Sequence, residues 1–420
     1  MLLALIIFIF TYILMLCFPK YKHYVATCSA LIFIILGILP LNKVLGEIDF
    51  NVILMIFGTM GTVSLFIESK MPELLSDFII KRMPNIKWMT VVLSLFAGIV
   101  SAFIDNVATV LIIAPIVLVV AKKSKISPVI PIICIAIFSN LEGAATLTGD
   151  TTSLLLAKEI GMNFFDFFFY NNKIGLFFII QISLLVSAMV LLLLERKNIS
   201  KIDCKLNTTI SDYTPTVLLC LTIFTLIIVS FLENKPEIIN GLICTFYFFL
   251  GLIIKVLKSK NLKSIKSNIR EIDYETLLLL TSLFIIIGGI KEAGIIDFVS
   301  QLFVHLGDNQ LLLYTVIVFV SVLISAFIDN IPYVATMLPI ITTICATSTV
   351  NPTLLYYGLI IGATLGGNFT PIGASANITA IGILRKNGYT VKNKDYFKYS
   401  IPISLSAILS SYIIVLLLFG

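Results

Sequence analysis

Long apolar runs recur along the chain from Met1 to Gly420, and short polar stretches separate them. A helix needs about 20 apolar residues to cross a hydrocarbon core about 30 Å thick. Backbone inside lipid must satisfy its own hydrogen bonds, so such runs predict helices. The uninterrupted runs cover residues 2–18, 23–40, 52–67, 172–194, 214–232, 237–257, 275–290 and 399–419. The pattern predicts an all-α polytopic membrane protein with about 10 transmembrane helices.

Two further apolar stretches are interrupted by an Asp-Asn pair. Residues 88–121 contain Asp105-Asn106, and residues 311–345 contain Asp329-Asn330. A single helix over the 34 residues of 88–121 would be about 51 Å long, which exceeds the core thickness. We therefore predict two re-entrant hairpins that turn at these pairs. Two short complete spans would leave the flanking loops on the same sides, so this alternative stays open.

Two more spans, 128–160 and 352–384, contain polar segments rich in Gly and Thr near their middle. Glycine and proline interrupt helices, and the freed backbone groups are tolerated in a membrane only inside protein or beside water. These segments therefore predict broken helices near the midplane of the bilayer.

The chain contains an internal duplication. The string Ser101–Asn106 (SAFIDN) returns as Ser325–Asn330, 224 positions later, and Pro115 matches Pro339 at the same offset. The first half covers 1–197 (hairpin 88–121, broken span 128–160), the linker 198–213, and the second half 214–420 (hairpin 311–345, broken span 352–384). Each half has five spans and one returning hairpin. Because five is odd, the two halves are expected to form inverted-topology repeats with a binding site between them.

Charge is sparse and strongly biased. Hydrophobic residues make up 59% of the chain and charged residues only 12%. In this topology, 24 of the 29 lysines and arginines, Lys20 and Lys22 included, fall in the loops of one face. The positive-inside rule makes that face cytoplasmic, with linker 198–213 on it and both termini outside. The bias accounts for the net charge of +6 without a nucleic-acid partner. We expect a lipid bilayer of the cytoplasmic membrane as the main partner, and the sequence allows a homodimer.

Cysteine and histidine do not indicate a metal centre. The seven cysteines contain no CxxC pair, and six of them lie in or beside apolar runs, while Cys204 lies in a polar loop. His23 and His305 have no partners at ligand spacing. We therefore predict no zinc site, no disulfide framework and no cofactor other than a coupling ion.

The hairpin tips and helix breaks hold the candidate site. Carboxylates and amides in a membrane are costly and usually functional. Freed carbonyls and hydroxyls suit a hard cation such as Na⁺, and helix N-termini suit an anion. The candidate ion- or substrate-binding residues are Asp105, Asn106, Thr109, Asn140, Glu142, Thr146, Thr148, Asp150, Thr151, Asp329, Asn330, Asn368, Thr370, Ser375 and Asn377. The candidate Na⁺ ligands are Asp105, Asn106, Asp329 and Asn330.

Each of these residues also has a purely structural interpretation. Asp105, Asp150 and Asp329 could cap the helices that follow them. The asparagines could satisfy backbone freed at the breaks, and Glu142 could titrate or simply be buried. The repeated acidic pairs Glu47/Asp49 and Glu271/Asp273 lie at span entrances, where we interpret them as interfacial structure.

The chain has four motifs in order: the Asp105-Asn106 tip, the break within 128–160, the Asp329-Asn330 tip and the break within 352–384. Together they resemble the ion transporter superfamily. That group contains arsenite permeases, NhaD-type sodium/proton antiporters, the melanosomal P protein, and citrate and dicarboxylate permeases. The resemblance implies that Asp105-Asn106 and Asp329-Asn330 are hairpin tips and that 146–152 and 370–377 line the site. The Asp-Asn tips are similar to the P protein and NhaD-like branch, whereas dicarboxylate permeases carry Ser-Asn-Thr there.

These observations predict a secondary active transporter, not an enzyme, that is coupled to Na⁺ or H⁺ and works by alternating access. The cargo is a small ion in a Na⁺/H⁺ antiporter, or a small anion in a permease of the arsenite, citrate or dicarboxylate type. The four motifs contain no basic residue, so an anion would depend on helix ends and bound cations. A primary pump is excluded by the lack of a GxxxxGK[ST] motif. An intramembrane aspartyl protease is a remote alternative, and a channel stays open.

Overall fold

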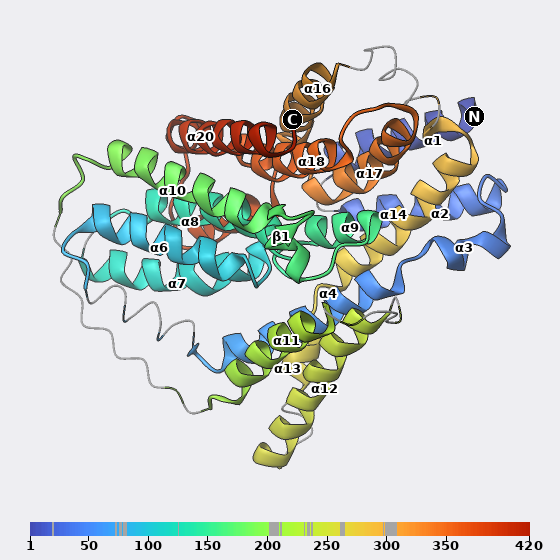
Figure 1. Cartoon of the computed structure of the whole chain (residues 1–420). Helices are drawn as coiled ribbons and strands as arrows, with labels where there is room; N and C mark the ends of the chain where they lie inside the picture. The colour runs from blue at the N-terminus through green and yellow to red at the C-terminus, as the bar shows by residue number, and fades with distance from the viewer. Residues whose placement is uncertain are drawn as a thin grey trace.

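The computed structural model is nearly all helical, as Figure 1 shows. It describes residues 1–18, 21–71, 74, 78, 82–124, 126–200, 210, 212–230, 232, 236, 238–260, 265–296, 298 and 309–420. His305 and Cys204 lie outside these residues, as does most of the predicted linker 198–213. A short antiparallel hairpin supplies the only strands in the described ranges, β1 (Phe169–Tyr170) and β2 (Lys173–Ile174), with Phe169 opposite Ile174.

The first half contains α1 (Leu2–Cys17), α2 (Lys22–Ile35), α3 (Leu41–Glu47), α4 (Phe50–Glu68), α6 (Ile86–Ser101), α7 (Asn106–Ser124), α8 (Val129–Glu142), η2 (Gly143–Ala145), α9 (Thr151–Ile160), η3 (Phe165–Phe167) and α10 (Leu176–Leu194). The second half contains α11 (Thr214–Ser230), α12 (Ile239–Ser259), α13 (Lys266–Glu271), α14 (Tyr274–Glu292), α16 (Gln310–Ser325), α17 (Asn330–Thr347), α18 (Pro352–Gly366), η5 (Gly367–Phe369), α19 (Ser375–Lys386) and α20 (Asn393–Phe419).

The helices are long and apolar enough for a multi-pass membrane protein, which confirms the predicted fold class. In the described part of the chain, α4, α10, α12, α14, α17 and α20 each have the length and composition to cross a membrane. Seven shorter apolar helices accompany them, among them α1, α2, α6 and α16. The predicted span 23–40 is shorter than expected, because α2 ends at Ile35 and Gly37 adopts a φ of +68° before Pro40 starts α3.

The duplication is visible in the helix bounds. Helices α4 and α14 begin and end 224 residues apart, and so do α6 and α16, and η2 and η5. Equivalent side chains cap them: Asp49 accepts from the Val52 N–H at 2.9 Å and Asp273 from the Thr276 N–H at 3.0 Å. Because an N-cap side chain satisfies a free helix amide, equivalent caps start equivalent helices. The opposite membrane orientation of the two halves stays a prediction.

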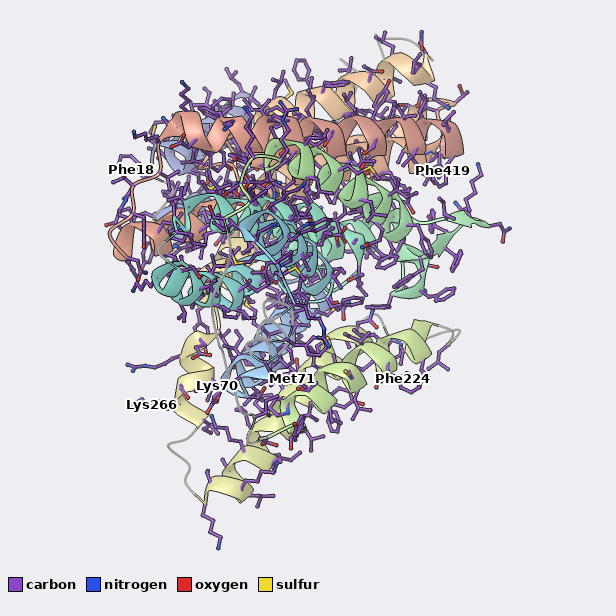
Figure 2. All side chains as sticks on the ribbon, turned by 90° about the vertical axis from the view of Figure 1, so that its left-hand side faces the viewer. Phe18, Lys70, Met71, Phe224, Lys266 and Phe419 are labelled. Carbon is purple, nitrogen blue, oxygen red and sulfur yellow. The ribbon has the colours of Figure 1, made fainter. Side chains whose placement is uncertain are left out.

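The two halves are interlocked. Helix α2 packs on α14, and α4 packs on α12, so each of these pairs joins the first half to the second. Helices α9 and α17, and α7 and α19, also meet across the halves. In Figures 1 and 2, α4, α11, α12 and α13 lie together on one side of the molecule, apart from α6, α8, α10 and α20. The protein therefore has two layers, each built from both halves.

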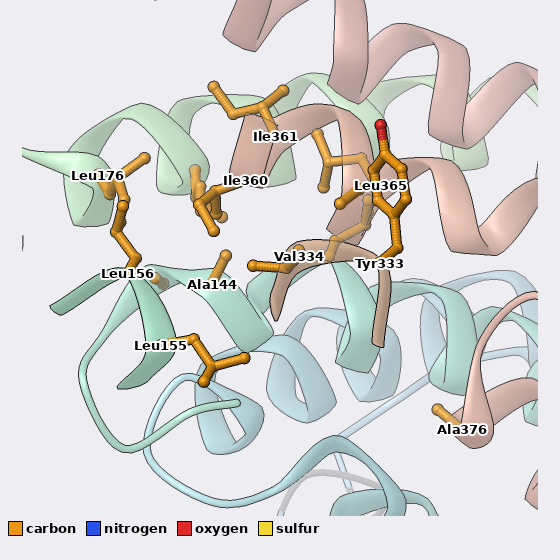
Figure 3. Packing of buried hydrophobic residues seen from close by; sticks show 14 of the residues in the cluster. Ala144, Leu155, Leu156, Leu176, Tyr333, Val334, Ile360, Ile361, Leu365 and Ala376 are labelled. Carbon is orange, nitrogen blue, oxygen red and sulfur yellow. The ribbon is translucent and has the colours of Figure 1, made fainter. Parts of the chain in front are cut away.

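The core lies where the halves meet. Figure 3 shows Leu155 and Leu156 of α9, Val334 of α17, and Ile360 and Ile361 of α18 packed around Ala144. All of them are buried. In contrast, α12 exposes Phe246, Phe249 and Leu257 on its outer surface, which suits contact with lipid chains.

Candidate functional site

Each helix break is fastened to the hairpin of its own half. Helices α6 and α7 meet at a turn over residues 102–105, and α16 and α17 meet at the equivalent turn. The hydroxyl of Thr146 donates to the Ala102 carbonyl, and that of Thr370 donates to the Ala326 carbonyl. These two hydrogen bonds hold the loops after η2 and η5 against the hairpin turns.

Two glycines allow this close approach. A Cβ atom on Gly149 would lie 2.6 Å from the Gly143 carbonyl oxygen. A Cβ atom on Gly373 would lie 2.6 Å from the carbonyl oxygens of Ala326 and Gly367. Only glycine lets backbone come this near to backbone without displacement. Gly149 and Gly373, which have no side chain, therefore let the loops reach the hairpin turns, and the hydroxyls of Thr146 and Thr370 hold them there.

A buried cluster of asparagines joins the two halves behind these loops. Asn140 Oδ1 accepts from Asn106 Nδ2 at 3.0 Å and from Asn330 Nδ2 at 3.4 Å. Asn140 Nδ2 donates to the Thr364 carbonyl at 2.8 Å and to Asn368 Oδ1 at 3.2 Å. Asn140 on α8 thus contacts both hairpin tips and α18.

Two other asparagines donate to backbone carbonyls. Asn377 Nδ2 donates to the Gly367 carbonyl in the second break at 3.3 Å, and Asn368 Nδ2 donates to the Ile137 carbonyl within α8 at 3.0 Å. Both side chains are buried. A buried carbonyl without a partner would cost about 1–3 kcal/mol, so these amides stabilise the breaks.

Asp105 and Asp150 cap helices. Asp105 Oδ1 accepts from the backbone amides of Val107 and Ala108 at 3.0 and 3.1 Å, at the start of α7. Asp150 Oδ1 accepts from the Thr151 amide at 2.7 Å, at the start of α9. A carboxylate has about four lone-pair positions, so capping does not exhaust either group. Each can still accept a cation or a proton.

Asp329 is held differently. Its Oδ2 forms an ion pair with Lys22 Nζ and accepts from the Ser375 hydroxyl at 3.0 Å. The side chain of Asp329 makes no capping hydrogen bond at the start of α17. The equivalent aspartates of the two hairpins therefore differ in their partners.

Lys22 corrects a sequence-based expectation. We counted it among the loop charges that set topology, and no basic residue was expected at the motifs. The structure makes it the first residue of α2 and brings it onto Asp329. The sequence contains no signal for this contact, because Lys22 and Asp329 are 307 positions apart and the repeat has no lysine at the matching position.

A cavity of about 530 Å³ opens at the hairpin tips. Its polar lining residues include Lys22, Asp105, Asn106, Thr148, Asp150, Thr151, Glu271, Asp273, Asp329, Asn330 and Ser375. Five of these are carboxylates and one is a lysine. Glu271 and Asp273 were interpreted only as interfacial structure, yet they line this cavity. The described lining therefore has an excess of acidic over basic side chains.

A second cavity, of about 610 Å³, lies beside the C-terminal part of α9. Its lining includes Asp49, Leu147, Leu154, Lys158 and Asn240. Lys158 Nζ lies 3.4 Å from Asp49 Oδ2. Leu154 lines both cavities, so they are neighbours along α9, the first beside its start and the second beside its C-terminal part.

Some predicted site residues lie away from both cavities. Glu142 is fully buried; its Oε2 accepts from Gln181 Nε2 at 2.6 Å, while its Oε1 has no hydrogen-bond partner among the described residues. Thr109 is also buried, and its hydroxyl has no partner in the same ranges. Asn140, Thr146, Asn368, Thr370 and Asn377 lie behind the first cavity and do not line it. The remaining predicted residues do line it.

No metal-binding cluster is found in the described ranges, where no three His, Cys, Asp or Glu side chains could hold an ion together. His23 Nδ1 lies 3.5 Å from Glu275 Oε2, at the start of α2. The absence of a resident metal stays a prediction.

Comparison with known proteins gives concordant matches. A family model described as citrate transporter matches residues 5–362. A 46 kDa membrane protein of Mycobacterium leprae is 29% identical over 96% of both chains. An uncharacterized transporter of Mycobacterium tuberculosis is 30% identical over 81% of this chain and 80% of its own length. The P protein of Mus musculus is 25% identical over 87% of this chain and 53% of its own.

The fold is similar to that of a solved transporter. The crystal structure of the YdaH transporter of Alcanivorax borkumensis aligns with a TM-score of 0.59 at 12% identity, over 89% of this chain and 86% of that one. Together these matches confirm the resemblance that the four motifs indicate.

Proposed function

Because this chain belongs to the citrate transporter family, whose model spans most of its length, we propose that it is a cation-coupled secondary transporter. Na⁺ or H⁺ is the coupling ion, and a small ion or a small anion is the cargo. The protein lies in the cytoplasmic membrane, surrounded by lipid, with both termini outside. It can form a homodimer. Asp105, Asp150 and Asp329 receive the coupling ion.

The observation that carries this proposal is the charge of the first cavity. Three aspartates at the starts of α7, α9 and α17 (Asp105, Asp150 and Asp329) line it, and Lys22 is the one basic side chain among its described lining residues. Ionised carboxylates that face one cavity repel each other, and this repulsion grows as their separation and the local dielectric constant fall. Cation or proton binding relieves this repulsion, so an empty cavity favours cation entry.

The size of the cavity bears on the cargo. About 530 Å³ exceeds what a bare monovalent ion needs and lies in the range of small-molecule sites, about 300–1,000 Å³. A polyatomic anion fits beside a cation, and the family description favours a citrate-type anion. A carboxylate-lined cavity would repel such an anion alone, so the cation binds first and supplies the countercharge.

Exchange of Na⁺ for H⁺ is the second candidate. It is favoured by the excess of carboxylates over the single lysine, because carboxylates accept either ion at the same oxygen atoms. In this form the cavity carries no anion, and Asp105 and Asp150 exchange protons for Na⁺.

The two cavities support alternating access. They follow one another along α4 and α9 and share Leu154, which is 6% exposed. Leu154 is thus an apolar side chain at the boundary between them. Movement of α9 with the Leu147–Asp150 loop would open one cavity as it closes the other.

A protease mechanism receives no support from the site. An aspartyl protease needs two carboxylates that share one proton at about 3 Å. Here Asp105 caps α7 and Asp329 pairs with Lys22, so the two groups are held by other partners.

Current measurement on proteoliposomes tests the proposal. Purified protein on a solid-supported membrane is exposed to Na⁺ steps and to pH steps, with and without citrate, a dicarboxylate or arsenite. Ion-driven currents or coupled uptake that protein-free liposomes lack support the proposal. If no Na⁺ or pH gradient drives flux of any of these ions, the proposed function is wrong.

A further inference from the structure

Lys22 and Asp329 form the ion pair inside the first cavity. Their side chains are 26% and 18% exposed, so both charges are largely removed from water. A partly buried carboxylate without a partner is costly, and breaking such a pair usually destabilises a protein by a few kcal/mol. Lys22 therefore supplies the positive charge that Asp329 needs when no ion is bound.

The duplication shows that this lysine belongs to one half only. The position 224 residues after Lys22 is Phe246, which is exposed on the outer surface of α12. In the described part of the chain, no lysine, arginine or histidine lies within salt-bridge distance of Asp105, which two backbone amides hold instead. The aspartate is duplicated but its lysine is not, so Lys22 has a role specific to the second hairpin.

We propose that Lys22 is a tethered competitor for the coupling cation, which occupies the Asp329 oxygens in the empty transporter and is displaced when Na⁺ binds there. This inference rests on the proposed function and adds the position of the ion. The Asp329 carboxylate and the Ser375 hydroxyl, which is already 3.0 Å from it, are the oxygen ligands that the structure offers.

The displaced ammonium has other partners. Asp273 and Glu275, at the start of α14, are close enough to attract Lys22 electrostatically, and Asp273 lines the same cavity. Lysine is long and rotatable, so it can move from Asp329 toward these carboxylates without movement of α2. Na⁺ binding thus moves the ammonium group of Lys22 from Asp329 at the hairpin tip toward Asp273 and Glu275 at the start of α14.

The competition has a cost and a benefit for transport. It weakens Na⁺ binding, because Na⁺ must replace an existing ion pair. It also keeps Asp329 neutralised while the site is empty, so the empty transporter does not expose a bare carboxylate in the membrane. Lys22 is therefore a positioning residue for the ion cycle.

The decisive variant is Lys22→Gln, with Lys43→Gln as the matched control. Lys43 forms a comparable ion pair, at 2.8 Å from Glu292, and does not line the first cavity. Thermal unfolding of the full chain in detergent is followed while NaCl replaces N-methyl-D-glucamine chloride at constant ionic strength. The half-saturating Na⁺ concentration should fall about tenfold in Lys22→Gln, a usual size for coupling between two bound charges. It should stay unchanged in Lys43→Gln. An unchanged or higher value in Lys22→Gln overturns the inference.

A second measurement needs no variant. In the wild-type protein, Na⁺ should raise the labelling of Lys22 by an amine-reactive reagent several-fold, while labelling of Lys43 stays constant, as read by peptide mass spectrometry. Equal or lower labelling of Lys22 in Na⁺ overturns the inference even if Lys22→Gln does not fold. If gradient-driven flux is observed but neither Na⁺ effect appears, only this inference fails; if no gradient drives flux, the proposed function fails.

Discussion

Substitution of Gly373 by alanine tests the geometry of the second break most directly. The new Cβ atom would lie 2.6 Å from both the Ala326 and Gly367 carbonyl oxygens and 2.8 Å from that of Ser325. Ordinary contact begins at 3.4 Å, so the loop must move away by about 0.8 Å (3.4 minus 2.6). All three neighbours are backbone atoms, so no side chain can rotate to make room.

This movement of the loop would also shift residues of the site. Gly373 lies between Thr370, which donates to a carbonyl of the hairpin turn, and Ser375, which donates to Asp329. Overpacking of this kind costs about 1–3 kcal/mol. A shift approaching 1 Å at a positioning element can cost about 100-fold in rate. We therefore expect coupled flux in Gly373→Ala to fall by about 10- to 100-fold, with a lower unfolding temperature.

The assay measures the initial rate of flux into proteoliposomes at equal protein density. It includes alanine variants of two further glycines, Gly149 and Gly382. Gly149→Ala places its Cβ 2.6 Å from the Gly143 carbonyl oxygen and should lose flux to a similar extent. Gly382→Ala is the control, since its Cβ has nothing within 4 Å on helix α19, where alanine favours the helix by about 1 kcal/mol. Wild-type flux in Gly373→Ala, or an equal loss in Gly382→Ala, would refute the reasoning.

Three more predictions concern the site. Asp105→Asn and Asp329→Asn should each abolish coupled flux but leave expression largely intact, as measured by ion-driven uptake and by size-exclusion chromatography; wild-type flux in both variants would exclude the assigned roles. Asn140→Leu removes the amide oxygen that accepts from both hairpin tips, and should destabilise the protein by about 1–3 kcal/mol and lower its unfolding temperature, whereas an unchanged melting curve would contradict a linking role. Leu154→Ala should thin the barrier between the cavities and raise passive Na⁺ leak, and Leu156→Ala, which lines neither cavity, serves as the control. Equal leak in both variants would count against the barrier.

Much of the fold could be predicted because membrane-spanning helices and helix breaks can both be recognised from short stretches of sequence. The interruption at Asp105-Asn106 and the Gly-rich segment around Gly149 are readable from the chain, since charge and flexible backbone are rare in apolar runs. The structure makes the first the turn between α6 and α7 and the second the gap between η2 and α9. The constant offset located the equivalent elements of the second half in the same way.

The parts that could not be predicted depend on contacts between distant segments. Lys22 resembled any loop lysine until the structure placed the start of α2 next to Asp329, and no residue near it in the sequence signals that contact. Asp273 was interpreted as interfacial structure; the structure shows that it caps α14 and also lines the first cavity. Glu142 resembled a site residue by its position in a break, but its carboxylate accepts from Gln181 on α10 and does not line the first cavity.

The exchange of helices between the halves restricts how the molecule can move. With α2 packed on α14 and α4 packed on α12, a hinge motion that pulled the two repeats apart would have to break these helix contacts. The helices that hold the breaks are exchanged as well, since α9 packs on α17 and α7 on α19. We therefore expect the movement of α9 and the Leu147–Asp150 loop in a transport cycle to carry the hairpins and breaks with it as one block.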